Sequence, residues 1–172
     1  MGRKLSFTVP GVPKGKARPR FDPRSGRAFS SKETVAEERA IATIFKLKFP
    51  HHQPFTGAVM MRFTAVFPIP KGFSAAQRAA ALEGTLLHTS TPDKDNVEKQ
   101  IADAINGLAW VDDSQVMGGG MKRYGEVPRI DVTLEELDTV VASPAEKRRR
   151  TKLVRQPELA LEKYRRGKPR RA

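Results

Sequence analysis

The segment "TPDKDNVEKQIADAINGLAWVDDSQV", residues 91–116, gathers five aspartates and one glutamate in a chain that is otherwise strongly basic. The 172 residues of the chain include 32 lysines and arginines against 19 acidic residues, a formal net charge of +13. Acidic side chains find basic partners easily in such a chain. The concentration of so many in one short segment therefore indicates a specific role.

A helix is predicted in the middle of this acidic segment. Apolar residues recur at helical spacing, and the pattern stops at Gly107; they are Val97, Ile101, Ala104 and Ile105. The spacing predicts an amphipathic helix over residues 96–106, with Asp95 as its N-cap and Glu98 as the partner in a capping box. Trp110 is expected to be a core residue that supports the aspartates after it.

Two pairs of aspartates flank this predicted helix. An extended Asp93-Lys94-Asp95 would place both carboxylates on one side of the chain, and Asp112 and Asp113 follow at the entry to a predicted strand. A loop and helix of this length can bring the second pair back beside the first, so three or four carboxylates are expected to converge. A bound Mg²⁺ or Mn²⁺ would remove their mutual repulsion. The segment therefore predicts a divalent-metal site.

Each of these acids also has a simpler explanation. Asp95 can be a helix cap, Asp93 a turn residue, and Asp112 with Asp113 a solvated turn before a strand. An EF-hand is excluded, because Glu98 would occupy the position of its glycine.

Lys99 has two possible roles. It lies four residues after Asp95 and four before Asp103, so it can belong to a surface stripe of ion pairs worth a few tenths of a kcal/mol. Alternatively, it points at the metal site and holds a phosphate.

The rest of the chain predicts a small α/β domain with a mixed β-sheet and helices packed on it. Alternating apolar residues predict strands at residues 5–9 and 58–67, the second near the sheet centre and bonded to the first, and in "SQVMGGGMKRY" and "RIDVTLEEL". Amphipathic patterns predict a helix over residues 31–49 capped by Ser31, and a short helix opened by Ser74. Gly118 to Gly120 are expected to make a strand irregularity.

Charge is concentrated at the two ends of the chain. Residues 1–29 carry 8 basic and 1 acidic residue, and residues 143–172 carry 12 basic and 3 acidic residues. We expect one domain over residues 1–142 and a flexible basic extension over residues 143–172. Two basic segments around an acidic pocket are typical of an enzyme that binds a polyanion and holds a metal.

The first basic segment is predicted to be a DNA-contacting loop or irregular hairpin that turns near Ser25-Gly26. Its cations stand among prolines and glycines; they are Lys14, Lys16, Arg18, Arg20, Arg24 and Arg27.

Several classes of protein are excluded by composition. Without cysteine the chain has no disulfide, thiolate metal site or cysteine nucleophile. No apolar run suits a signal peptide or a membrane span, so the chain is expected in the cytoplasm and away from membranes. His51, His52 and His88 lack metal-ligand spacing and are expected to be surface or connection residues.

The acidic segment resembles the signature of the RusA family of Holliday junction resolvases, or crossover junction endodeoxyribonucleases. The shared pattern is D-x-D-N-x-x-K, then D-A-(L/I), then W-x-D-D-x-Q-V, and "VPGVPKGKARPRF" is similar to the opening strand and basic loop of phage-type members. The two matches span most of residues 5–134. The chain departs in having Pro92 where the best-known members have a basic residue, and in its basic tail.

The resemblance implies a small homodimeric α/β enzyme that nicks four-way DNA junctions with Mg²⁺, with Mn²⁺ as the expected substitute. It places the metal-site aspartates at Asp93, Asp95 and Asp113, with Asp112 as a further candidate, and the essential lysine at Lys99. These residues are expected to be catalytic, except Asp112, whose role is left open.

The expected reaction is phosphodiester hydrolysis by two symmetric nicks, in DNA recombination and repair. The metal would activate a water for in-line attack, while Lys99 stabilises charge on the phosphate oxygens. Two alternatives stay open from the residues alone: a DNA-binding module in which the carboxylates are structural, and a nuclease that prefers forks or flaps.

Overall fold

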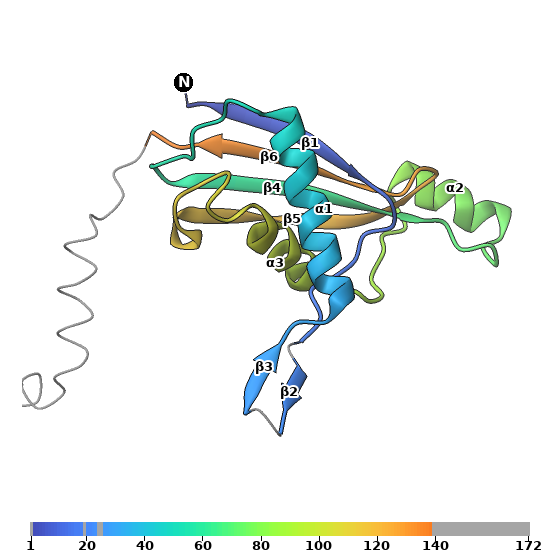
Figure 1. Cartoon of the computed structure of the whole chain (residues 1–172). Coiled ribbons are helices and arrows are strands. Elements are labelled where there is room, and N and C mark those ends of the chain that lie inside the picture. Colours follow the sequence, from blue (N-terminus) through green and yellow to red (C-terminus); the bar gives the residue numbers. More distant parts are fainter. Residues whose placement is uncertain (1, 19, 24–25, 139–172) are drawn as a thin grey trace, which may run out of the picture. The chain divides into compact units, whose positions relative to one another are not determined.

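The computed structural model describes residues 2–18, 20–23 and 26–138. The predicted extension over residues 143–172 lies outside them. The described residues form a mixed α/β fold (Figure 1). Its elements are β1 (Lys4–Pro10), β2 (Arg20–Asp22), β3 (Arg27–Phe29), α1 (Lys32–Lys48), β4 (Val59–Pro68), α2 (Ala75–Glu83), α3 (Lys94–Ile105), a 3₁₀ turn (Asp113–Gln115), β5 (Val116–Gly125) and β6 (Arg129–Glu136).

The main sheet has the strand order β1-β6-β4-β5, and β2 with β3 forms a separate two-stranded hairpin. β6 pairs antiparallel with both β1 and β4, whereas β4 pairs parallel with β5. The expectation that β4 bonds to β1 is wrong, because β6 lies between them. Apolar alternation identifies strands and their buried faces, but the order of strands depends on contacts between distant segments.

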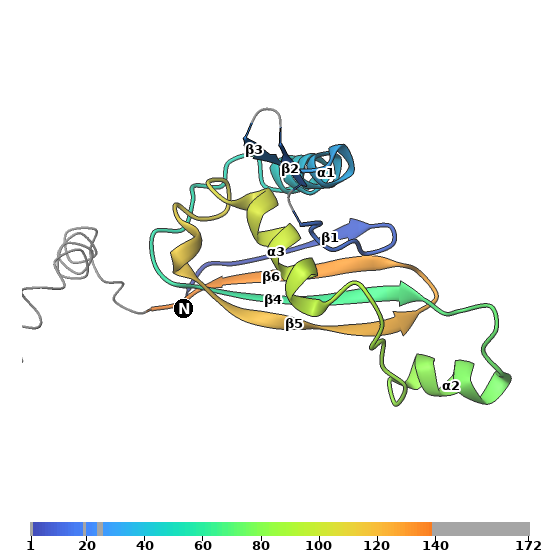
Figure 2. The same cartoon turned by 90° about the horizontal axis from the view of Figure 1, so that it is seen from below.

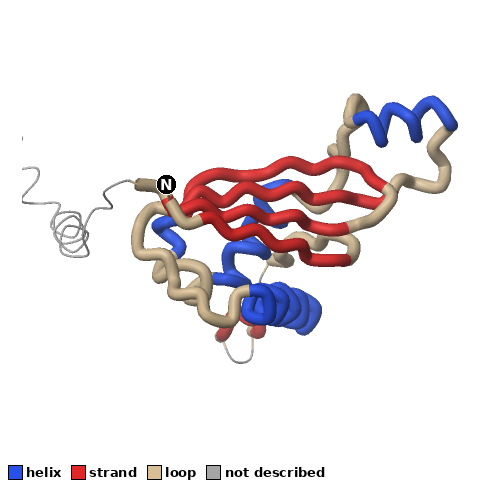
Figure 3. The backbone as a smooth tube through the Cα atoms, turned by 90° about the horizontal axis from the view of Figure 1, so that it is seen from above, coloured by secondary structure: helices blue, strands red, loops and turns tan. Residues whose placement is uncertain are grey.

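Two helices cover one face of this sheet. Figures 2 and 3 show α1 and α3 lying over the same face, while α2 projects beyond the strand ends. The core lies between these layers, and its side chains are almost fully buried; they include Ile41, Phe45, Met61, Val97, Ile101, Ile105, Val132 and Leu134. No described helix is long and apolar enough to cross a membrane.

The opposite face of the sheet carries polar side chains that bond across strands. Ser6 and Thr133 hydroxyls lie 3.2 Å apart, and Thr8 Oγ1 donates to Asp131 Oδ1 at 2.9 Å. The predicted alternation of apolar and polar residues in β1 and β6 is therefore confirmed.

The first two predicted helix caps are confirmed. Thr34 N–H donates to Ser31 Oγ at 3.2 Å at the start of α1, and Ser74 forms a full capping box with Gln77 at the start of α2. The strand irregularity predicted for Gly118 to Gly120 is found at Gly118, which has a φ of +116° and where a Cβ would lie 2.1 Å from the Met61 carbonyl oxygen; the other two glycines continue the pairing with β4 without a break.

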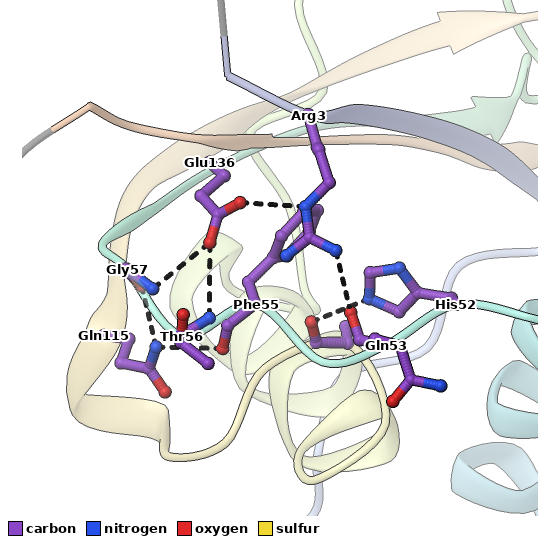
Figure 4. Close-up of polar contacts among 9 residues, drawn as sticks. Arg3, His52, Gln53, Phe55, Thr56, Gly57, Gln115 and Glu136 are labelled. Atoms are coloured by element: carbon purple, nitrogen blue, oxygen red, sulfur yellow. Dashed lines mark hydrogen bonds and ion pairs between the residues drawn. The ribbon is translucent and has the colours of Figure 1, made fainter.

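Glu136 at the end of β6 fastens the connection before β4 to the sheet (Figure 4). Its carboxylate accepts from Arg3 Nε at 2.9 Å and from the backbone N–H groups of Thr56 and Gly57 at 3.2 Å each. The hydrogen bond from Arg3 is the largest cause that lowers the pKa of Glu136 from its ordinary value of 4.5. The hydrogen bonds from the Gly57 and Thr56 backbone N–H groups also lower this pKa.

Replacing Glu136 by glutamine is expected to lower the free energy of unfolding at pH 7 by about 1.5–3 kcal/mol, the scale of hydrogen bonds to a charged group. Because folding lowers the pKa of Glu136, this contribution is fully present above pH 4.5 and is lost as the pH falls through the folded-state pKa. Urea unfolding of both proteins across this range measures the difference.

Glu135→Gln is the matched control, since Glu135 pairs with Arg62 on the exposed face, where an ion pair contributes less than about 1 kcal/mol. A Glu136→Gln effect that did not change with pH would contradict the assigned role of the carboxylate.

Candidate active site

The first turn of α3 begins two residues earlier than predicted. Val97 N–H donates to the Asp93 carbonyl oxygen at 3.2 Å, so Asp93 occupies the N-cap and Asp95 lies inside the first turn. The predictions of an N-cap at Asp95 and of an extended Asp93-Lys94-Asp95 are therefore wrong. The helix extends over Lys94 and Asp95 because the backbone can already form its first bond there.

The carboxylates of Asp93 and Asp95 make no stabilising contact with another side chain or a backbone group within the described residues. Asp93 makes no side-chain capping bond, although Ser31 and Ser74 do so at the other two helix starts. Neither carboxylate forms a hydrogen bond or ion pair with another described residue, and both residues are exposed. Aspartate is among the strongest capping residues, so a carboxylate at an N-cap that does not cap is available to a ligand.

The turn before Asp93 is held from β5. Lys122 Nζ donates to the carbonyl oxygens of Ser90 at 2.6 Å and of Pro92 at 2.9 Å. The Thr91–Pro92 peptide bond of this turn is cis. Lys122 therefore fixes the backbone from which the Asp93 carboxylate projects.

The second pair of aspartates divides into two roles. Asp112 caps the 3₁₀ turn, accepting from Ser114 N–H at 2.9 Å. Asp113 is exposed, and its carboxylate makes no hydrogen bond or ion pair with any other residue that the structure describes. Both aspartates are exposed, as the predicted solvated turn requires; Asp112 caps this turn, whereas the Asp113 carboxylate has no partner among the described residues.

Gln115 holds this turn in place, a role that the sequence reasoning missed. Its buried amide donates to the carbonyl oxygens of Phe55 at 3.1 Å and Gly57 at 2.7 Å (Figure 4). Its amide oxygen accepts from Asp112 N–H at 2.8 Å. The glutamine of the W-x-D-D-x-Q-V motif was the available signal. A glutamine that is buried at the start of a strand needs hydrogen-bond partners for its amide.

The two sets of aspartates lie at opposite ends of α3. Asp93 is the N-cap of α3, and Lys122 of β5 holds the turn before it, whereas the turn of Asp113 lies near the C-terminal end of α3, where Gln115 bonds to Phe55. α3 has 12 residues and spans about 18 Å. Among the described residues, no group of three or more Asp, Glu and His side chains could hold a metal ion. The expected convergence of three or four carboxylates is not found here.

The first turn of α3 nevertheless suits a hard divalent cation. Mg²⁺ is usually bound by one or two carboxylates together with substrate phosphates, and it keeps several waters. Asp93, at the N-cap, and Asp95, in the first turn, provide two exposed carboxylates that no described residue pairs with. They fit this mode of binding without a closed cage of acids.

Lys99 does not belong to an ion-pair stripe. It forms no ion pair with any described carboxylate, and the i,i+4 pair on α3 joins Lys94 to Glu98 at 3.1 Å instead. Asp103, its other expected partner, pairs with Lys16. Lys99 is exposed and lies four residues after Asp95, so the two side chains share one face of the helix.

Lys99 lines a cavity of about 320 Å³ between α3 and the basic loop. The loop contributes Lys16, Ala17 and Arg18, and α3 contributes Asn96, Lys99 and Asp103; Ser30 completes the lining. Three of these side chains are cationic, but Lys16 is paired with Asp103, so the remaining positive charges are those of Arg18 and Lys99. Such a concave, positively charged site suits a phosphate group.

The basic loop therefore has more than one function. Lys14 pairs with Glu37 of α1, and Lys16 pairs with Glu38 and Asp103, whereas Arg18 lines the cavity. The predicted hairpin is confirmed by the β2–β3 pairing, in which Arg27 is exposed. Arg24 lies outside the described residues, and Arg20 lies on β2.

The aromatic and histidine residues near the site are structural. Trp110 is fully buried, as predicted. His52 Nε2 bonds with the Ala109 carbonyl oxygen at 3.0 Å (Figure 4), and the half-buried His88 stacks on Phe67 with ring centroids 3.8 Å apart. His51 is exposed.

Residues 10–135 match the family described as Endodeoxyribonuclease RusA. The chain is also similar to the uncharacterized protein YqaN of Bacillus subtilis (strain 168), with 33% identity over 139 residues that cover 77% of this chain and 96% of that protein. The chain therefore belongs to the RusA family of endodeoxyribonucleases. This membership indicates endodeoxyribonuclease activity, and it agrees with the resemblance found in the sequence.

Proposed function

We propose that this protein is a structure-selective endodeoxyribonuclease that resolves Holliday junctions by paired symmetric nicks, in DNA recombination and repair. The observation that supports this most directly is the pairing of uncommitted carboxylates with a cationic cavity on α3. Asp95 and Lys99 share one helix face, so a phosphate held in the cavity would lie beside the carboxylates of the first turn.

The proposed metal is Mg²⁺, with Mn²⁺ as a substitute, held by Asp93, Asp95 and Asp113. When bound, Mg²⁺ supplies charge stabilisation and activates water for attack on phosphorus. Asp93 and Asp95 bind from one turn of α3. The inclusion of Asp113 rests on the family resemblance alone, since the described fold places its turn at the other end of α3. Asp112 is better explained by its capping bond.

Lys99 is proposed to bind a non-bridging oxygen of the scissile phosphate. Its ammonium is a compact charge with three donors, and negative charge grows on the phosphate oxygens as water attacks. No described carboxylate neutralises Lys99, so its charge remains available to DNA.

A four-way junction has two-fold symmetry, and two symmetric nicks require two equivalent sites. We therefore propose a C₂ homodimer. The proposed division of the chain is an endonuclease domain over residues 1–142 and a basic extension over residues 143–172, and the proposed location is the cytoplasm.

A nicking assay tests this function. The full chain is incubated with a synthetic mobile four-way junction, a fork, a flap and a linear duplex, each with and without Mg²⁺. We expect Mg²⁺-dependent paired nicks at symmetric positions of the junction. Binding without nicking would favour a non-catalytic module, and stronger cleavage of the fork or flap would overturn the proposed substrate.

Deleting residues 143–172 is expected to leave the fold and the nicking rate at saturating DNA intact, because the family match ends at residue 135. Junction binding should weaken and depend less steeply on salt, since the segment carries 12 basic residues and each cation on a phosphate contributes about 0.9 to the salt slope. Binding titrations at several salt concentrations measure the slope. An unchanged slope would show that the extension has another function.

A further inference from the structure

Lys16 stands apart from the other cations of the basic loop. Its side chain is 18% exposed, and its ammonium pairs with two carboxylates. Glu38 of α1 lies 2.9 Å away, and Asp103 of α3 accepts a hydrogen bond from it. Lys14, two residues earlier, is 60% exposed and pairs with Glu37 alone. A single ammonium thus joins the loop to both helices that cover the sheet.

The backbone around Lys16 is fastened at the same place. Lys16 N–H donates to the Asn96 carbonyl oxygen at 2.9 Å. A Cβ at Gly15 would lie 2.7 Å from Pro92 Cβ and 3.1 Å from Asn96 Cβ, so the loop approaches α3 more closely than a side chain would allow. The loop is therefore docked on the first turns of α3, next to Asp93 and Asp95.

The charges around Lys16 do not favour a contact with DNA. Partial burial lowers the pKa of Lys16, but the hydrogen bonds and charges of Asp103 and Glu38 outweigh it and raise the pKa from 10.5. One ammonium faces two carboxylates, so the local net charge is negative. A phosphate would have to displace these partners and approach both of them.

We propose that Lys16 is a positioning residue rather than a DNA contact, and that Asp103 and Glu38 are its partners. Together they hold the loop on α3, so that Arg18 and Lys99 line the same cavity and can bind the same phosphate group. This assigns a role to Asp103, whose position recurs in the family signature. The functional consequence rests on the nuclease activity proposed above, whereas the docking of the loop does not.

Loop docking can be measured without DNA, by hydrogen exchange of the Lys16 amide. Lys16→Met, Asp103→Asn and Glu38→Gln are expected to accelerate this exchange by roughly 10- to 100-fold, the scale of losing a hydrogen bond to a charged group. Glu37→Gln is the matched control, because it removes only the partner of Lys14. Unchanged exchange in Lys16→Met and Asp103→Asn would overturn the proposal, even if the protein nicks junctions as proposed.

Nicking then separates a positioning residue from a DNA contact. We expect Lys16→Met and Asp103→Asn each to slow single-turnover nicking at saturating junction about tenfold. The nicking rate of the double variant should lie within about threefold of either single variant, because both changes break the same ion pair. The salt slope of binding should not change. If Lys16 contacted DNA, Lys16→Met would lower the slope by about 1, and Asp103→Asn would leave binding equal or tighter; that result would overturn the proposal.

A wild-type chain that does not nick junctions would contradict the proposed function alone. The exchange experiment would still decide whether Lys16 docks the loop.

Discussion

Asp93→Asn, Asp95→Asn and Asp113→Asn are each expected to slow nicking of four-way junctions by roughly 10³-fold or more, at least the scale of losing a transition-state interaction. Asparagine keeps the shape of the side chain but removes the charge that binds Mg²⁺. Junction binding should survive or tighten, because each change removes a negative charge near phosphates. Single-turnover nicking and binding titrations with each variant measure the two effects.

Thermal stability separates this result from a loss of fold. The three aspartates are exposed and their carboxylates make no hydrogen bond or ion pair with other described residues, so the midpoint of unfolding should hardly change. Asp112→Asn is the matched comparison, because asparagine caps as well as aspartate does and the capping bond would remain. Mg²⁺-dependent nicking at the wild-type rate by all three variants would show that the site lies elsewhere.

Lys99→Met is expected to slow nicking by roughly 10²-fold while the unfolding midpoint and junction binding change little. Methionine keeps the aliphatic part of the side chain and loses only the charge, and no described carboxylate would be left without a partner. Lys99→Arg should also be slow, because a planar guanidinium cannot replace a compact ammonium beside a bound metal. Single-turnover rates at saturating Mg²⁺ measure both.

Lys94→Met provides the control on the same helix. Lys94 pairs with Glu98 at 3.1 Å and is half exposed, so its loss should cost only about 0.3–0.5 kcal/mol of stability and leave the rate near that of the wild type. If Lys99→Met nicked as fast as the wild type, Lys99 would be an ordinary surface lysine of α3.

The sequence predicts the elements of this fold better than their arrangement. Local signals suffice where a pattern and its cap agree, as at Ser31 and Ser74, and the period-2 alternation of β6 is equally clear. The position of β6 between β1 and β4 could not be predicted, because each strand carries the same alternation whichever neighbour it has. The start of α3 was misplaced since Asp93 and Asp95 are equally good caps by composition.

For the candidate site too, the sequence predicts the residue types better than their arrangement in space. The residue types that suit metal and phosphate, Asp93, Asp95 and Lys99, were identified from their spacing and from the family resemblance. The pairing of Asp103 with Lys16 could not be predicted, because the two residues are 87 positions apart and the local spacing favoured Lys99 as the partner. The separation of Asp113 from Asp93 depends on how α3 crosses β5, which is a matter of tertiary packing.

β4 and β5 are parallel neighbours, so the chain that joins them must return across the sheet, and this return contains α2, α3 and the whole acidic segment. α2 is the part of this crossover that projects away from the sheet, with Ala81 as its buried residue (Figure 3). Doubling the length of a flexible loop costs only about 0.6 kcal/mol. Insertions in the loops that flank α2 are therefore expected to cost little stability and to leave α3 and its aspartates in register with β5.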